Sequence, residues 1–147
     1  MELECKIIEE TDFGGCSKEL MLAFKEEPWN ENWTYEQAYT RIDEIMSAKV
    51  SRGYVIYDDD TVVSMLCGRV MTYLDFKELW VDEFSVTPSY QRQGIGGKML
   101  KFVREQLKKE SINCMVLNTE RGYPSVKFYE KNGFKQDDSL VFMANDF

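Results

Sequence analysis

The stretch YQRQGIGGKML, Tyr90–Leu100, places three glycines within four positions, directly before a segment with helical spacing. A plain turn needs glycine only where the backbone takes a positive φ. Several glycines beside the start of a helix leave backbone N–H groups bare, and such groups can be approached closely by an anion. The stretch therefore predicts an anion-binding turn. A tight turn without a ligand is the alternative.

Two nucleotide-binding patterns do not fit this turn. The dinucleotide pattern G-x-G-x-x-G, started at Gly94, would need its last glycine where Met99 stands. The P-loop pattern G-x-x-x-x-G-K-[ST] would need a glycine in place of Arg92 and a hydroxyl in place of Met99. The turn still has the general affinity of a helix start for anions. Successive N–H groups from Gly94 to Lys98, with the positive end of a helix dipole behind them, favour a phosphate or pyrophosphate.

The composition predicts one globular domain over residues 1–147. Hydrophobic residues make up 44% of the chain and aromatic residues 14%, enough for a single core. The N-terminal MELECKIIEE lacks a basic region followed by an apolar stretch, so we expect no export signal, no membrane association and a cytoplasmic location. The net charge of −8 disfavours a nucleic-acid partner and suits a cationic one, although acidic surfaces also serve solubility alone.

The cysteines and the missing histidine exclude several kinds of chemistry. The chain contains no histidine, so it has no Ser–His or Cys–His catalytic pair. Its four cysteines are scattered without a C-x-x-C motif, so we expect buried thiols and no metal site.

Hydrophobic periodicity divides the chain into helices and strands. Helical spacing predicts helices over residues 16–27, 34–48, 95–110 and 124–134, the second opened by a capping box of Thr34 and Gln37. Runs of β-branched and aromatic residues predict strands over residues 3–8, 53–57, 61–74, 79–86, 112–118 and 140–144. The connection from 79–86 to 112–118 is long enough to make these two strands parallel neighbours. The order predicts an α/β (α+β) fold, with a mixed, mostly antiparallel central sheet and helices on both faces.

The segment SVTPSYQRQGIGGKML resembles the acyl-CoA-binding signature of the GNAT superfamily of N-acetyltransferases. The core of that signature, Q/R-x-x-G-x-G/A, is occupied here by Gln91, Arg92, Gln93, Gly94, Ile95 and Gly96. Its context agrees as well, since Val86-Thr87-Pro88 precedes the turn and FYEKNGF follows the next strand. The resemblance covers roughly Leu3 to Ala144 and implies the GNAT acyltransferase fold, with acetyl-CoA as cofactor.

The resemblance also implies how the coenzyme is held. Backbone amides around the glycine turn would hold the pyrophosphate, and the pantetheine arm would lie between the strand ending at Val86 and the strand ending at Asn118. Arg92 and Lys98 either meet the additional phosphate or are ordinary solvated cations. The implied coenzyme-binding residues are Phe84, Ser85, Val86, Gln91, Arg92, Gln93, Gly94, Ile95, Gly96, Gly97, Lys98, Asn118, Ser125 and Tyr129.

Two catalytic residues follow from the chemistry and the resemblance together. At neutral pH only about one alkylamine in a thousand is uncharged, so a carboxylate, Glu83, is expected to take the proton, directly or through water. A solvated Glu83 with a water chain as base stays open, as does Asp82 if a bulge shifts the strand register. Tyr129 matches the family tyrosine that protonates the departing thiolate. The Val86 N–H would polarise the thioester carbonyl.

The acceptor is expected to meet the segment EEPWNENWT between the first two helices. Trp29, Trp33 and Tyr35, with Glu83, are the candidate acceptor-binding residues. Glu26, Glu27 and Glu31 would complete an aromatic, anionic cradle for a protonated amine. Alternatively, Trp29 and Trp33 are core residues packed around Pro28. The segment also resembles a subgroup of the family often grouped with aminoglycoside acetyltransferases.

The sequence therefore predicts an acetyl-CoA-dependent N-acetyltransferase. The acetyl group would move to a primary amine of a small cationic acceptor by direct transfer in a ternary complex. Two alternatives stay open: a protein or peptide N-acetyltransferase, and a non-catalytic acyl-CoA-binding sensor. A homodimer is compatible with the sequence.

Overall fold

The computed structural model describes residues 2–147. Its helices are α1 (Phe13–Lys25), α2 (Tyr35–Met46), α3 (Ile95–Lys109) and α4 (Pro124–Lys131), with short 3-10 turns η1 (Glu10–Asp12) and η2 (Pro88–Tyr90). Its strands are β1 (Leu3–Ile7), β2 (Ser51–Asp58), β3 (Thr61–Tyr73), β4 (Phe76–Val86) and β5 (Met115–Val116). In the part of the chain that the structure describes, no helix is both long and apolar enough to cross a membrane.

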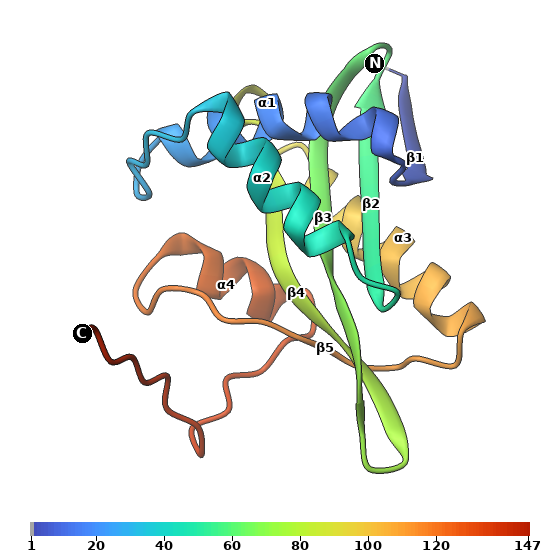
Figure 1. Ribbon diagram of the computed structural model, residues 1–147, viewed down its shortest axis with the longest axis vertical. Coiled ribbons are helices and arrows are strands. Elements are labelled where there is room, and N and C mark those ends of the chain that lie inside the picture. Colours follow the sequence, from blue (N-terminus) through green and yellow to red (C-terminus); the bar gives the residue numbers. More distant parts are fainter. Residues whose placement is uncertain (1) are drawn as a thin grey trace.

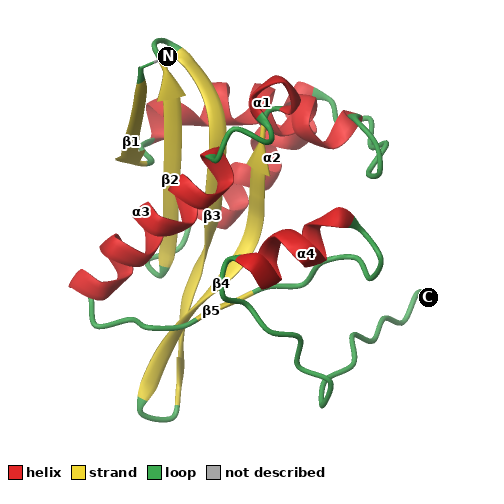
Figure 2. Ribbon diagram, turned by 180° about the vertical axis from the view of Figure 1, so that it is seen from behind, coloured by secondary structure: helices red, strands yellow, loops and turns green. Residues whose placement is uncertain are grey.

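The strands form one sheet in the order β1-β2-β3-β4-β5. The first three pairings are antiparallel, and β4 and β5 are parallel, which confirms the predicted mixed sheet and its crossover. Helices α1 and α2 cover one face of the sheet and α3 covers the other, as Figures 1 and 2 show from opposite sides. Because β5 is only two residues long, it leaves most of β4 without a second strand neighbour.

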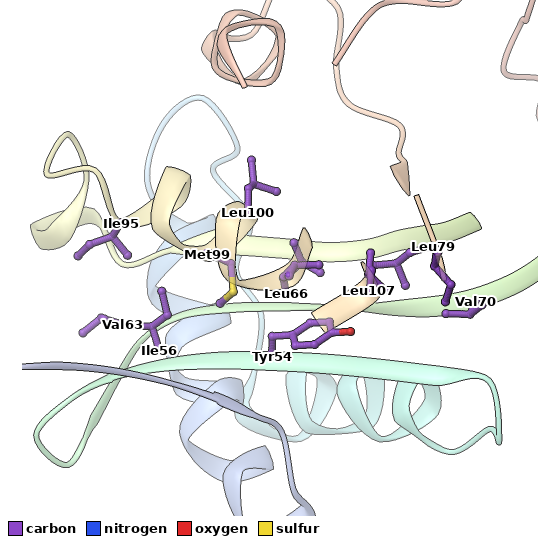
Figure 3. Close-up of a cluster of buried hydrophobic side chains, with 12 residues drawn as sticks. Tyr54, Ile56, Val63, Leu66, Val70, Leu79, Ile95, Met99, Leu100 and Leu107 are labelled. Atoms are coloured by element: carbon purple, nitrogen blue, oxygen red, sulfur yellow. The ribbon is translucent and has the colours of Figure 1, made fainter. Parts of the chain in front are cut away.

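Two apolar clusters hold the layers together. Between α3 and the sheet lie Ile95, Met99, Val103 and Leu107, whose spacing of four residues places them on one face of the helix. Figure 3 labels Ile95, Met99 and Leu107 of this stripe. On the other face, α1 and α2 pack against β2 and β3. The predicted capping box of α2 is present: the Gln37 N–H donates to Thr34 Oγ1, and the Thr34 N–H donates to Gln37 Oε1.

A β-bulge interrupts the pairing of β3 with β4. Cys67 faces Glu83 and Gly68 faces Val81, so Asp82 is the extra residue of the bulge. A Cβ at Gly68 would lie 1.9 Å from the Trp80 carbonyl oxygen, so only glycine allows this close approach of the two strands. The register shift that the sequence left open is thus present, one residue before Glu83.

The predicted strand over residues 140–144 is wrong, and the strand over 112–118 is shorter than predicted. Residues after Phe134 turn at Asp137, whose carboxylate accepts from the Ser139 N–H, and then lead away from the sheet (Figure 1). Leu140 to Met143 are 69–83% exposed. Strand propensity expresses packing on a neighbouring strand, and this segment has no strand neighbour to pair with. Residues 115–116 are half-buried, so they are not covered on both faces as predicted.

Candidate active site

A cavity of about 860 Å³ opens where β4 and β5 separate. The two strands pair only at Leu79 with Met115 and at Trp80 with Val116. Beyond this point the edge of β4 from Val81 to Val86 lines the cavity, opposite residues 117–120. The end of α1, the loop before α2, the glycine turn and α4 supply the remaining walls. The separated strands therefore leave a slot with unpaired strand backbone on one side.

The cavity gathers most of the sequence-predicted site residues. Those on its wall are Trp29, Trp33, Glu83, Phe84, Ser85, Val86, Gln91, Arg92, Asn118, Ser125 and Tyr129. Gln93, Gly94, Ile95, Gly96, Gly97 and Lys98 continue from the wall into the start of α3. The Ile95 side chain belongs to the core, so only its backbone is available to a ligand. The predicted residues thus come from five separate segments of the chain to one cavity.

Tyr35 is the exception among the predicted acceptor residues. It is the first residue of α2, it does not line the cavity, and its ring lies 6.0 Å from that of Tyr39. Its hydroxyl lies against α1, 3.1 Å from where a Cβ of Gly14 would be. The start of α2 directs this side chain toward α1, so the structure does not bring Tyr35 to the site.

The glycine turn presents uncapped backbone N–H groups. Gly94 is the N-cap of α3 with φ of 78°, and no side chain caps the helix. Gly96 packs so closely on α4 that a Cβ there would lie 2.7 Å from the Phe128 ring. The Gln91 side chain donates to the Val86 carbonyl oxygen at 3.0 Å and ties the turn to the end of β4. The turn can therefore offer N–H donors to an anion at one end of the cavity.

The ladder between β3 and β4 also directs the Val86 N–H. The Thr87 N–H donates to the Val63 carbonyl oxygen at 2.9 Å, while Val86 faces Ser64. In an antiparallel ladder, hydrogen-bonded pairs alternate with pairs whose N–H groups point away from the partner strand. The Val86 N–H therefore points to the open edge of β4, where the cavity lies.

Glu83 is a half-buried carboxylate with one cationic partner. Its side chain is 13% exposed, and its Oε1 lies 3.0 Å from Nε of Arg41 on α2. Burial raises the pKa of Glu83 above its ordinary value, and the Arg41 charge opposes this shift only in part. The sequence did not predict Arg41, which lies 42 residues away along the chain and carries no motif. Asp82, in contrast, forms two hydrogen bonds with Arg69, at 2.8 and 3.0 Å.

Tyr129 lies among aromatic rings on the opposite side of the slot. Its ring centroid is 5.3 Å from those of Phe128 and Phe134 and 6.2 Å from that of Phe84. Burial, and secondarily the charge of Glu83, raises the pKa of Tyr129 well above its ordinary value. The phenol therefore keeps its proton at neutral pH and can act as a donor. Ser125 lies on the same helix, with its hydroxyl 2.7 Å from that of Thr119.

The remaining wall is aromatic and mostly acidic. Trp29 packs between Phe24 and Tyr123, and Trp33 donates from Nε1 to Glu31 at 2.8 Å. Both tryptophans therefore pack against neighbouring side chains and also line the cavity. The sequence offered a core position and a cavity position as alternatives, and the two side chains occupy both. Acidic wall residues are Glu27, Glu31, Asp82, Glu83 and Glu120, against the cations Arg41 and Arg92. Glu26 is not on the wall.

One polar residue beside the site was missed. Glu19 on α1 is 1% exposed, and Ser85 Oγ donates to its Oε1 at 2.5 Å. A sequence signal existed, because the buried stripe of Cys16, Leu20 and Ala23 places position 19 on the inner face of the helix. A carboxylate at such a position needs buried polar partners, which the strand sequence alone does not identify.

The fold matches solved acetyltransferase structures over the whole chain. A protein described as "a possible acetyltransferase" from Clostridium difficile is 16% identical, with a TM-score of 0.82 and coverage of 100% of this chain and 99% of that one. A protein from Bacillus halodurans described as a transcriptional regulator is 22% identical, with a TM-score of 0.77 and coverage of 99% and 100%. An aminoglycoside 6'-N-acetyltransferase from Acinetobacter haemolyticus is 12% identical, with a TM-score of 0.75 and coverage of 98% and 99%.

Sequence comparison identifies the family. The model of the acetyltransferase (GNAT) family matches residues 18–134, from α1 to the end of the segment that follows α4. This range contains the glycine turn, the open edge of β4 and all the walls of the cavity except Phe142. The chain belongs to the GNAT family of acetyltransferases.

Proposed function

We propose that this protein transfers the acetyl group of acetyl-CoA to a primary amine of a small cationic acceptor, by direct transfer within a ternary complex. One observation carries the proposal. Glu83 and Tyr129, from different elements, face a single cavity whose wall includes Gln91 and Arg92, the residues that lead into the uncapped start of α3. A proton acceptor, a proton donor and an anion-binding turn are the three features that acetyl transfer to an amine requires.

The residues present fit coenzyme A. The uncapped N–H groups between Gln93 and Lys98 suit its pyrophosphate, and the unpaired edge of β4 suits the amide-containing pantetheine arm. Arg92 lines the cavity beside this turn and supplies a positive charge for a further phosphate. Bound there, acetyl-CoA would supply an activated acetyl thioester.

Glu83 is the proposed proton acceptor for the incoming ammonium group. Its raised pKa brings it closer to that of an amine, so proton transfer becomes less unfavourable than to an exposed carboxylate. Arg41 holds Oε1 and leaves Oε2 without a hydrogen bond to a described residue. A cationic amine can therefore approach the same carboxylate, directly or through one water molecule.

Tyr129 and the Val86 N–H are proposed to act on the thioester side. The Val86 N–H points into the slot and can polarise a carbonyl oxygen, a contact typically worth a few kcal/mol at the transition state. Tyr129 is protonated at neutral pH, and although burial makes it a weaker acid, it can donate this proton to the departing thiolate as negative charge develops on the sulfur. Phe128 and Phe134 hold the ring in place and keep water away from it.

The acidic wall supports a cationic acceptor. Five carboxylates, those of Glu27, Glu31, Asp82, Glu83 and Glu120, line the cavity, against the two cations Arg41 and Arg92. Trp29 and Trp33 add aromatic surface on which an ammonium group can rest. The Acinetobacter neighbour is named as an aminoglycoside acetyltransferase, which is consistent with a polyamine-like acceptor, although at 12% identity the likeness shows the fold alone.

A thiol-release assay tests the proposal. Acetyl-CoA is offered with aminoglycosides, polyamines, amino acids and short peptides, and calorimetry with acetyl-CoA runs in parallel. We expect acetyl-CoA to bind and the multiply charged small amines to give the highest kcat/KM. Turnover of peptides alone would replace the small acceptor by a protein substrate. Binding without turnover would favour a sensor, and neither binding nor turnover would contradict the proposal.

A further inference from the structure

The C-terminal end of β4 has a strand neighbour on one side only. Beyond Trp80 its single strand neighbour is β3, because β5 has already separated. This end nevertheless carries Glu83 and the Val86 N–H, both of which need a fixed direction for the proposed reaction. Side-chain hydrogen bonds from outside the ladder can supply that restraint.

Glu19 supplies such a restraint from α1. Its Oε1 accepts from Ser85 Oγ at 2.5 Å, and its Oε2 lies 3.4 Å from Thr87 Oγ1. The Ser85 carbonyl oxygen in turn accepts from Ser64 Oγ at 2.8 Å. Val86 lies between the two residues that Glu19 binds, so its peptide group is fixed on both sides.

Burying the carboxyl group of Glu19 at this position costs free energy. It is 1% exposed and has no cationic partner among the described residues. Burial, opposed by the Ser85 and Thr87 hydrogen bonds, raises the pKa of Glu19 to about 8. A buried carboxyl group bound only by hydroxyls does little for stability that an apolar side chain would not do. Its geometry is better explained by what it orients.

We propose that Glu19 is a positioning residue for acetyl transfer: through Ser85 and Thr87 it fixes the end of β4 and thereby the directions of the Val86 N–H and the Glu83 carboxylate. This inference rests on the function proposed above. Glu19 does not line the cavity, so it acts through β4 and touches neither substrate. Ser85 and Glu83 share a face of β4, since side chains two residues apart point the same way.

Two substitutions of Glu19 separate hydrogen bonding from charge. Glu19→Gln keeps an acceptor for Ser85 and gains a donor for Thr87, whereas Glu19→Leu removes both bonds at similar volume. We expect kcat to fall roughly ten- to hundred-fold in Glu19→Leu, because small displacements of reacting groups are costly. The KM for acetyl-CoA should change much less. Glu19→Gln should recover most of the lost kcat.

A control variant and a double-mutant cycle complete the kinetic test. Ser17→Ala removes another buried hydroxyl of α1, whose hydrogen bond goes to the Phe13 carbonyl oxygen within the helix and not to β4. It should leave kcat near that of the wild type. Combining Glu19→Leu with Ser85→Ala should cost little more than Glu19→Leu alone, since Glu19→Leu already removes the hydrogen bond that Ser85→Ala breaks.

Amide hydrogen exchange reads the same inference without turnover. In Glu19→Leu the Thr87 amide, which donates to the Val63 carbonyl oxygen, should exchange faster than in the wild type and in Ser17→Ala, while amides of β2 stay protected. Unchanged exchange at Thr87, an unchanged kcat in a folded Glu19→Leu, or a loss in Glu19→Gln equal to that in Glu19→Leu would each overturn the positioning role. If the wild type neither binds acetyl-CoA nor turns over, the proposed function fails, and the exchange arm still decides whether Glu19 fixes β4.

Discussion

The two ends of the cavity are built from different chemistry. The end proposed to bind the coenzyme, called here the coenzyme end, consists of backbone N–H groups, at the start of α3 and along the open edge of β4. The end proposed to bind the amine, called here the acceptor end, consists of side chains, chiefly Glu83, Trp29 and Trp33, brought from β4 and from the loop before α2. Acetyl-CoA binding at the coenzyme end should therefore depend on the glycines that leave the backbone accessible, and reaction at the acceptor end on individual side chains. Substitutions at each end can test the two dependences separately.

Tyr129 lies where the two ends meet, and its loss should have the largest effect. Tyr129→Phe keeps the ring packed against Phe128 and Phe134 but removes the acidic proton. We expect kcat to fall about 100-fold or more, with little change in acetyl-CoA affinity. Thiol release and calorimetry measure the two quantities. Tyr73→Phe, on the exposed β3–β4 hairpin, is the matched control. A Tyr129→Phe rate near that of the wild type would remove the general-acid role.

Glu83 should affect the acceptor end alone, with an effect that depends on pH. Glu83→Gln should lower kcat/KM for the amine by roughly 10- to 100-fold at neutral pH. The loss should shrink as the pH approaches the amine pKa of about 10, because the amine then loses its proton without help. Rate–pH profiles measure this. Asp82→Asn, which changes the neighbouring carboxylate held by Arg69, should cost less. Equal rates for wild type and Glu83→Gln at both pH values would assign proton removal to water.

The contrast between the two ends also explains what the sequence could predict. The geometry of the proposed coenzyme end could be predicted because glycines and a helix start form a local pattern, and local patterns determine backbone geometry. The proposed acceptor end could be predicted only in part. Trp29, Trp33 and Glu83 were predicted and line the cavity, but Arg41 and Glu19 meet β4 across 42 and 66 residues of sequence.

The same reasoning covers the fold. The sheet order, the α2 capping box and the α3 stripe follow from periodicity and local hydrogen bonds. The last predicted strand failed because a strand also requires a neighbour, which residues 140–144 lack. Tyr35 was predicted at the acceptor site but lies elsewhere, because the start of α2 directs its side chain toward α1. This direction depends on tertiary packing, which the local sequence does not show.

A substitution at Gly96 should change acetyl-CoA affinity by less than substitutions of Tyr129 and Glu83 change the reaction rate. In Gly96→Ala the new Cβ would lie 2.7 Å from the Phe128 ring, so this ring or the helix that carries it must shift. We expect acetyl-CoA affinity to fall by about tenfold, with kcat at saturation less affected. Gly97→Ala should cost less, because its Cβ would make an ordinary 3.6 Å contact with Asn132. Calorimetry on both variants decides, and a greater loss in Gly97→Ala would contradict this packing.

Glu19 should also produce a slope in stability with pH. Its folded-state pKa is raised from 4.5 to about 8, so the folded state holds the proton longer than the unfolded state. Its contribution to stability is complete below pH 4.5 and is lost as the pH rises through about 8. Urea unfolding across this range should show a steeper decline in the wild type than in Glu19→Gln, in which the raised pKa of Glu83 still contributes. Parallel curves would mean that Glu19 is ionised throughout.

A titration of the labelled protein with acetyl-CoA, followed by amide NMR, tests the central claim most directly. We predict that the largest shifts fall on backbone amides of two separate segments, Phe84 to Val86 on β4 and Gln93 to Lys98 at the start of α3. Shifts confined to other surfaces, or none at millimolar acetyl-CoA, would contradict the account.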